Sequence, residues 1–223
     1  MPILAPSILA ADFSNLEREI IEVCGDAVNV LHVDIMDGHF VPNITFGPDV
    51  VKALKKKFFC KYFDCHLMVS DPMKWVKSFA EAGANCITFH YEACSSDKEI
   101  KEIISAIVDL NVDVGIAINP DTSLSKIENL LNDNRIHHIL VMTVNPGFGG
   151  QKFNTEAVKK VSEIKKINYK ILVEVDGGVN LQTIELAIAH GADIIVVGSA
   201  LFNATNRKAT QLEFLKLLEK VTC

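Results

Sequence analysis

Short apolar runs recur along the chain, and segments with helical periodicity separate them. The runs are nearly continuous, as expected for strands that are buried on both faces of a parallel sheet. Eight such units within 223 residues favour an α/β fold, with a single (β/α)8 TIM-barrel domain over residues 1–223. The expected strands cover residues 3–9, 28–35, 62–69, 86–91, 113–119, 138–144, 170–176 and 193–198.

The segments between these strands carry helix boundary signals, and we expect a helix in each of them. Asp71-Pro72 predicts a helix start, and Gly83 predicts the end of the same helix. Asn180 and Gly191 frame another helix in the same way. A doubly wound open sheet is the alternative architecture. It usually has a GxGxxG motif after its first strand, whereas the first strand here ends Ala5-Pro6-Ser7.

Composition narrows the classes of function. The net charge of −6, without an extended basic cluster, disfavours a nucleic-acid-binding surface. No apolar run reaches the ~18 residues that a membrane helix needs, and no leader-like segment precedes the first strand, so we expect a cytoplasmic protein. The six cysteines form no CxxC pair, which favours reduced thiols.

Polar residues near the carboxyl ends of the strands are the main functional signal, because the active sites of barrels lie at that end. Side chains alternate along a strand, so His32 and Asp34 share one face, which is directed into the barrel. His66 lies in the next strand, and Asp176 ends the strand at 170–176. We expect these four side chains to converge at one mouth of the barrel.

Burying a bare charge costs several kcal/mol unless the charge is paired or bound to a metal. Two histidines and two aspartates at one mouth therefore predict a divalent metal site formed by His32, Asp34, His66 and Asp176. Imidazole nitrogens and carboxylate oxygens suit zinc, iron(II), manganese or cobalt. We expect one ion per subunit, with zinc as the first candidate.

Three further polar sites in the strands have other expected roles. Glu174 has the same parity as Asp176 and should lie one layer deeper, in a structural ion pair or hydrogen bond. His90 ends its strand and either contacts the substrate or supports the residues that do. His137 and His138 begin a strand, at the end of the barrel away from the expected chemistry.

Methionines occupy comparable places near the ends of three strands. Such residues either fill the core or exclude water from a charged intermediate. We include Met36, Met68 and Met142 among the candidate substrate contacts.

Glycine-rich segments follow the last three strands. Glycine lets backbone N–H groups approach an anion closely, and barrels often bind phosphate at these loops, near a short extra helix. The sequence therefore predicts a phosphate site, in which Ser199 would offer both a hydroxyl and a helix cap. The candidate contacts in these loops are Gly147, Phe148, Gly149, Gly150, Gly177, Gly178, Gly198 and Ser199.

Several of these segments resemble the ribulose-phosphate 3-epimerase family. The resemblance covers residues 4 to about 202, in order and evenly spaced. The segments that carry it are LAPSILAADF at 4–13, HVDIMDGHFVPNITFGP at 32–48, HLMV at 66–69, NPGFGGQKF at 145–153, VDGGV at 175–179 and GSALF at 198–202.

The resemblance implies an isomerase of the pentose phosphate pathway that interconverts D-ribulose 5-phosphate and D-xylulose 5-phosphate. It implies that Asp34 and Asp176 are the acid/base pair as well as metal ligands, and that Ser7 and His66 contact the small phosphorylated ketose. It also suggests a homo-oligomer, most simply a dimer.

Other functions stay open or are disfavoured by particular residues. A Schiff-base aldolase needs a lysine at the carboxyl end of a strand, whereas Lys170 lies at a strand start. A decarboxylase of the orotidine-phosphate type needs a DxK pattern where this chain has Asp64-Cys65-His66. A 3-epimerase of a six-carbon ketose phosphate, a metal-dependent hydrolase of a phosphorylated metabolite, and a non-catalytic binding protein for such a metabolite remain as alternatives.

Overall fold

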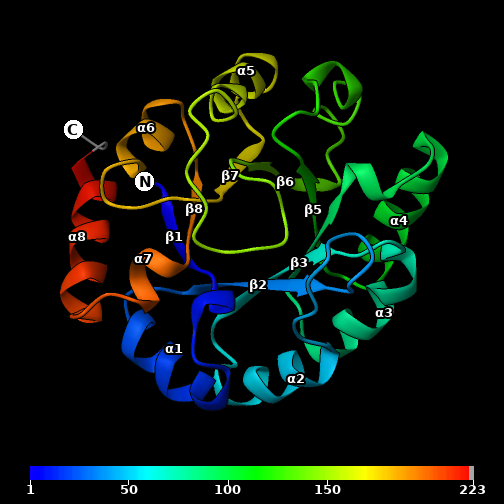
Figure 1. Ribbon diagram of the computed structural model, residues 1–223. Coiled ribbons are helices and arrows are strands. Elements are labelled where there is room, and N and C mark those ends of the chain that lie inside the picture. The colour runs from blue at the N-terminus through cyan, green and yellow to red at the C-terminus, as the bar shows by residue number, and fades with distance from the viewer. Residues whose placement is uncertain (221–223) are drawn as a thin grey trace.

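Eight parallel strands form one sheet that curls into a barrel (Figure 1). The structure is a computed structural model and describes residues 1–220, so the last three residues of the predicted domain lie outside the described part. The order of the strands in the sheet is β1-β8-β7-β6-β5-β4-β3-β2. The strands are β1 Ile3–Pro6, β2 Val30–Met36, β3 Tyr62–Met68, β4 Cys86–His90, β5 Asp113–Ile118, β6 Ile136–Met142, β7 Leu172–Asp176 and β8 Ile194–Val197.

The first and last strands in this order, β1 and β2, close the barrel through a single parallel bridge between Ser7 and His32. The predicted (β/α)8 TIM barrel is therefore confirmed. The bridge lies next to Asp34, so the closure of the barrel also fixes the position of one predicted catalytic residue.

Helices cover the outside of the barrel as a ring (Figure 1). The predicted boundaries of α3 are confirmed, because the Asp71 side chain accepts a hydrogen bond from Lys74 N and Gly83 adopts a left-handed conformation at the other end. The helices are α1 Leu16–Cys24, α2 Pro48–Lys57, α3 Pro72–Ala82, α4 Asp97–Asp109, α5 Lys159–Ile167, α6 Ile184–Ala189, α7 Ser199–Phe202 and α8 Arg207–Glu219.

The connection between β5 and β6 departs from the prediction of a helix between all neighbouring strands. Within residues 119–135 the structure has only the 3-10 helix η4 Leu124–Lys126, followed by turns. Several hydrogen bonds there span three residues, such as the one from Ile127 N to Leu124 O. Asn and Asp residues at 132–134 favour turns over a longer helix, because their side chains compete for backbone groups.

Alternating strand residues separate the two packing layers, as the sequence predicted. Val33 and Ile35 belong to the large apolar core between the sheet and the helices, with Val173 and Val175 from β7. His32 and Asp34 take the alternate positions on the inner face of the barrel, where they are buried. The functional residues therefore come from the inner face, while the outer face supplies most of the apolar packing.

Within residues 1–220, none of the helices combines the length and the apolar character that a membrane crossing would require.

Replacing Asp71 by alanine should lower the free energy of unfolding by about 1 kcal/mol, because the first turn of α3 loses its side-chain cap. Asp71→Ser should retain most of the stability, since serine caps a helix about as well as aspartate. Urea unfolding measures both values, and equal stability of Asp71→Ala and the parent protein would contradict the role of this cap.

Candidate active site

The four predicted metal ligands lie together at the mouth of the barrel. One ligand atom from each of His32, Asp34, His66 and Asp176 lies within 4.8 Å of the others. The Asp34 Oδ1 atom is 3.1 Å from His66 Nδ1 and 3.3 Å from His32 Nε2. Asp176 Oδ2 is 3.9 Å from His32 Nε2, and the Asp176 side chain is 17% exposed while the other three are almost fully buried. The group is therefore open to the mouth on the Asp176 side.

Carboxylates behind His32 orient its ring. His32 Nδ1 is 2.9 Å from Asp64 Oδ2 and 3.2 Å from Glu174 Oε1. A proton on Nδ1 forms the hydrogen bond to Asp64 and leaves the Nε2 lone pair directed at Asp34 and His66. Ligating histidines in metal sites have this arrangement. Asp64 was not among the predicted site residues, although its position two residues before His66 places it on the same face of β3.

A second hydrogen-bonded series orients His66. His66 Nε2 is 2.8 Å from His90 Nε2, and His90 Nδ1 is 3.1 Å from Glu92 Oε2. Burial and the nearby His66 lower the pKa of His90 to about 4, so its ring is neutral. Donation from His66 to His90 and from His90 to Glu92 then leaves the His66 Nδ1 lone pair facing Asp34. Of the two roles considered for His90, the structure places it in contact with the ligand residue His66.

Glu92 is a residue that the sequence analysis did not identify. Its carboxylate accepts hydrogen bonds from Asn119 N and from the Thr122 hydroxyl, in the loop after β5. The sequence signal for Glu92 is its position two residues after His90, at the end of a strand. Its contacts with Asn119 and Thr122 could not be predicted, because those residues are distant in sequence.

The donor set fits a divalent metal ion. Two imidazole nitrogens and two carboxylate oxygens are a common ligand combination for zinc and related ions. The two histidines have their remaining nitrogens occupied by hydrogen bonds, which is the second feature of a metal site. These residues could therefore hold a cation without rearrangement of the strands.

The two aspartates differ in acidity. Burial alone would raise the pKa of Asp34. When His32 and His66 carry protons on the nitrogens that face Asp34, their charge and their hydrogen bonds lower this pKa far below its usual value, and a bound cation would take the place of those protons. Burial and the neighbouring charge of Asp34 raise the pKa of Asp176 to about 6. One carboxyl group is thus held ionised, while the other takes up a proton near neutral pH.

Ser7 links the first strand to this pair. Its hydroxyl donates a hydrogen bond of 2.6 Å to Asp34 Oδ2, and both side chains are buried. Ser7 also accepts a hydrogen bond from Leu9 N, which fixes the turn after β1. Asp34 therefore has one oxygen toward the histidines and the other held by Ser7.

A cavity beside Asp34 and Asp176 contains the remaining predicted substrate contacts, apart from His66, which lies in the ligand group. The yellow-green loop after β6 runs across the barrel mouth and forms one of its sides (Figure 1). The predicted residues that line the cavity are Ser7, Met36, Met68, Met142, Gly147, Phe148, Gly149, Gly150, Gly177, Gly178, Gly198 and Ser199.

Ser199 is the first residue of α7 and does not cap it, in contrast to the prediction. Gly198 occupies the cap position, and no side chain forms the cap hydrogen bond. The Ser199 hydroxyl remains available to the cavity that Ser199 lines.

Gly178 allows the loops after β6 and β7 to approach each other closely. Its φ is +70°, and a Cβ atom there would lie 2.5 Å from Phe153 N and 2.7 Å from Gln151 O. Both contacts are backbone atoms of the loop after β6, so any side chain at Gly178 would displace that loop.

Sequence comparison with known proteins points to the same kind of enzyme as the geometry of the site. Residues 3–202 match the model of the ribulose-phosphate 3 epimerase family. The chain belongs to this family. The resemblance found in the sequence is confirmed, and so is the expectation of an isomerase that acts on carbohydrates.

Relatives within the epimerase family match over nearly their whole length. The chain is 41% identical over 210 residues to the ribulose-phosphate 3-epimerase of Bacillus subtilis, covering 92% of this chain and 94% of that protein. It is 42% identical over 202 residues to a protein of Oryza sativa subsp. japonica named as the cytoplasmic isoform, covering 90% and 87%.

Solved structures outside the epimerase family share the fold. The crystal structure of 3-hexulose-6-phosphate synthase from Salmonella typhimurium has a TM-score of 0.74 with 18% sequence identity, and the match covers 99% of this chain and 100% of that one.

Gly178→Ala should lower the free energy of unfolding by more than about 1 kcal/mol, because φ is positive and the added Cβ meets backbone. Gly149→Ala is the matched control, since nothing lies within 4 Å of its Cβ position, and it should change stability by less than about 0.5 kcal/mol. Urea unfolding compares the two variants, and similar values would contradict the close approach of the two loops.

Proposed function

We propose that this protein interconverts D-ribulose 5-phosphate and D-xylulose 5-phosphate through proton transfer at C3. Membership of the epimerase family supports the substrate pair. The observation that carries the proposed mechanism is the pair Asp34 and Asp176, which face one cavity with pKa values shifted in opposite directions.

Inversion at C3 requires removal of a proton from one face of the carbon and delivery of another to the opposite face. Asp34 is held ionised, so in one direction it would take the C3 proton, while protonated Asp176 would deliver its proton to the other face. The electron pair of the C–H bond passes to the C2 ketone as an enediolate and returns to form the new C–H bond. Two carboxylates with separated pKa values suit this division of roles.

His32, Asp34, His66 and Asp176 would hold one divalent ion, with zinc first and iron(II), manganese or cobalt as alternatives. When bound, the ion would supply the positive charge that stabilises the enediolate oxygen. Asp64 holds the ring of His32 in place, and His90 holds the ring of His66, each through one hydrogen bond.

The rest of the cavity suits a short phosphorylated chain. Glycine-rich loops after β6, β7 and β8 line one part of it and would bind the phosphate through backbone N–H groups and Ser199. Met36, Met68 and Met142 line the cavity near the aspartates and would exclude water from the intermediate.

The cellular location, the oligomeric state and the other partners of this protein stay predictions. We propose a cytoplasmic location because a rice relative is named as the cytoplasmic isoform. The homo-oligomer, most simply a dimer, and the absence of a nucleic-acid partner rest on the sequence alone.

Replacing Asp34 or Asp176 by asparagine should lower kcat by at least 10²–10⁴-fold, since each change removes a proton-transfer group and a proposed metal ligand. Asp49→Asn, at an exposed position in the first turn of α2, is the matched control and should retain full activity. A coupled assay with ribulose 5-phosphate measures turnover, and near-normal kcat in either site variant would exclude the two-aspartate mechanism.

Removal of divalent metal with a chelator should abolish activity, and added zinc, cobalt, manganese or iron(II) should restore it. Full activity in a preparation shown to be metal-free by elemental analysis would exclude a role for the ion in stabilising the enediolate.

Solvent deuterium separates the proposed reaction from its alternatives. The epimerase should incorporate deuterium at C3 of recovered pentose phosphate, because the delivered proton comes from a group that exchanges with solvent. Release of inorganic phosphate without label at C3 would indicate a hydrolase, and no turnover would indicate a binding protein. Faster turnover of a six-carbon ketose phosphate would indicate the longer substrate.

A further inference from the structure

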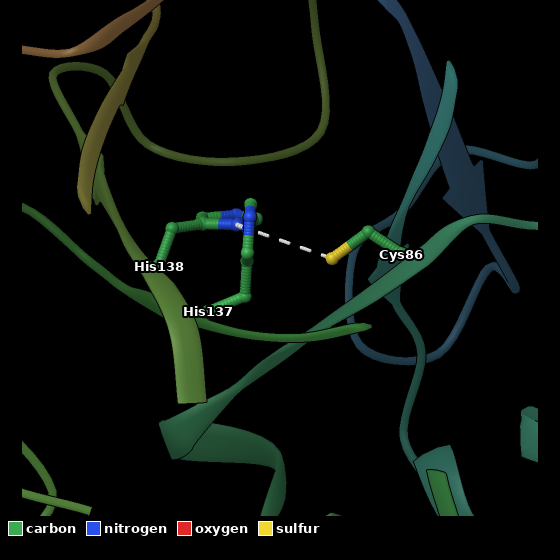
Figure 2. A group of neighbouring side chains, drawn as sticks. All are labelled: Cys86, His137 and His138. Carbon is green, nitrogen blue, oxygen red and sulfur yellow. Dashed lines mark hydrogen bonds between the residues drawn. The ribbon is translucent and has the colours of Figure 1, made fainter. Parts of the chain in front are cut away.

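A second group of potential metal ligands lies at the opposite end of the barrel. Cys86 comes from the start of β4, and His137 and His138 come from the start of β6 (Figure 2). One ligand atom from each lies within 4.8 Å of the other two. His138 Nδ1 is 3.9 Å from Cys86 Sγ and 3.4 Å from His137 Nδ1. None of these residues belongs to the proposed active site.

An irregularity in β6 brings two successive histidines together. Neighbouring residues in a regular strand point to opposite faces. Here Ile136 pairs with Val114 and His138 pairs with Gly115, so His137 is an extra residue without a partner in β5. A bulge of this kind redirects a side chain, and it accounts for the convergence of both rings on Cys86.

His138 is oriented as a metal-binding histidine. Its Nε2 atom is 2.8 Å from Glu174 Oε2, which leaves Nδ1 facing Cys86 and His137. A carboxylate behind the remote ring nitrogen is the usual outer partner of a ligating histidine. Glu174 thus lies behind His138 as Asp64 lies behind His32 in the active site, and the Thr88 hydroxyl, 3.2 Å from Nε2, forms the hydrogen bond to the His138 ring.

The barrel interior makes room for this ring at Gly115. A Cβ atom there would lie 2.7 Å from both Cε1 and Nε2 of His138 and would overlap the Thr88 hydroxyl. Any residue other than glycine would therefore move the ring from its position between Glu174 and Cys86.

The distances between the ligand atoms agree with those expected around a tetrahedral zinc ion. Zinc–nitrogen bonds of about 2.0–2.1 Å and zinc–sulfur bonds of about 2.3 Å place two nitrogens roughly 3.3 Å apart, and sulfur and nitrogen roughly 3.6 Å apart. The observed distances of 3.4 Å and 3.9 Å differ from these by only a few tenths of an ångström.

We propose that Cys86, His137 and His138 form a second metal site, which binds one divalent ion of borderline softness such as zinc. A thiolate and two imidazoles select this class of ion over magnesium or calcium. A cavity of about 220 Å³ adjoins both histidines at the amino-terminal end of the barrel, giving access for the ion and a place for a fourth, water ligand.

Binding would replace the thiol proton of Cys86 by the ion. Burial and the charge of Asp64 raise the pKa of Cys86, so the metal-free thiol is protonated and the ion displaces that proton into solvent. No electron transfer is involved, and the sulfur gains a bond to the metal as it loses its bond to hydrogen.

Cobalt(II) distinguishes the two sites, because only the second site contains a sulfur ligand. The full chain, stripped with a chelator and titrated anaerobically with cobalt(II), should bind two equivalents and develop the near-ultraviolet absorption of a cobalt–thiolate bond. Cys86→Ser should lose that absorption and one equivalent. Asp176→Asn should weaken the other equivalent and keep the absorption, so the result does not depend on the proposed epimerase mechanism.

Matched variants complete the test. Cys60→Ser removes an exposed thiol and should leave the absorption unchanged. His137→Gln changes a half-buried residue at the bulge and should weaken cobalt binding at this site at least 10-fold, which covers the case in which Cys86→Ser fails to fold. Absence of thiolate absorption in the parent protein, its persistence in Cys86→Ser, or unchanged affinity in His137→Gln would overturn the proposal.

Discussion

Four carboxylates surround one imidazole in the interior of this barrel. His32 Nε2 lies 3.3 Å from Asp34 and 3.9 Å from Asp176, while His32 Nδ1 lies 2.9 Å from Asp64 and 3.2 Å from Glu174. Buried carboxylates need compensating positive charge, because low-dielectric surroundings make an uncompensated charge expensive. His138 faces Glu174 on its other side, but neutral His32 and His66 rings offer no positive charge to Asp34 and Asp176, so a bound cation at the Nε2 side of His32 is the simplest compensation. The neighbouring imidazoles lower the pKa of Asp34, whereas burial and the charge of Asp34 raise the pKa of Asp176.

Strand register produces this arrangement. His32 is paired with Asp64, and Asp34 with His66, in the ladder between β2 and β3. The barrel closes next to these pairs, where Ser7 bridges to His32 and donates a hydrogen bond to Asp34. The site is thus built on rigid strands, and the loops after β6, β7 and β8 line the cavity beside it, where we propose that the substrate binds. Proton-transfer groups on strands and substrate contacts on loops are typical of barrel enzymes.

The sequence was sufficient for the fold and for the convergence of His32, Asp34, His66 and Asp176. Alternation along each strand sets which side chains face inward, and a barrel brings the carboxyl ends of its strands to one mouth. Alternation along β2 predicted that His32 and Asp34 face inward, and the glycine-rich segments marked the loops of the cavity. Features that depend on pairing between strands were not predictable. Asp64 and Glu92 became site residues only through partners distant in sequence, and the bulge at His137 depends on how β6 pairs with β5. The helix expected between β5 and β6 is absent from the described residues 119–135, and the spacing of apolar residues does not distinguish a helix from a series of turns in this segment.

Glu174 connects the two ends of the barrel interior. Its two oxygens face His32 on one side and His138 on the other. The same carboxylate therefore stands behind a proposed ligand of each metal site.

We propose that His32, Asp34, His66 and Asp176 share one cation. Anomalous diffraction from crystals grown with zinc or cobalt tests it directly, because the signal locates the ion without reference to activity. We expect a peak within bonding distance of His32 Nε2, His66 Nδ1 and both aspartates. Crystals that contain the metal but show no peak among these four side chains would contradict it.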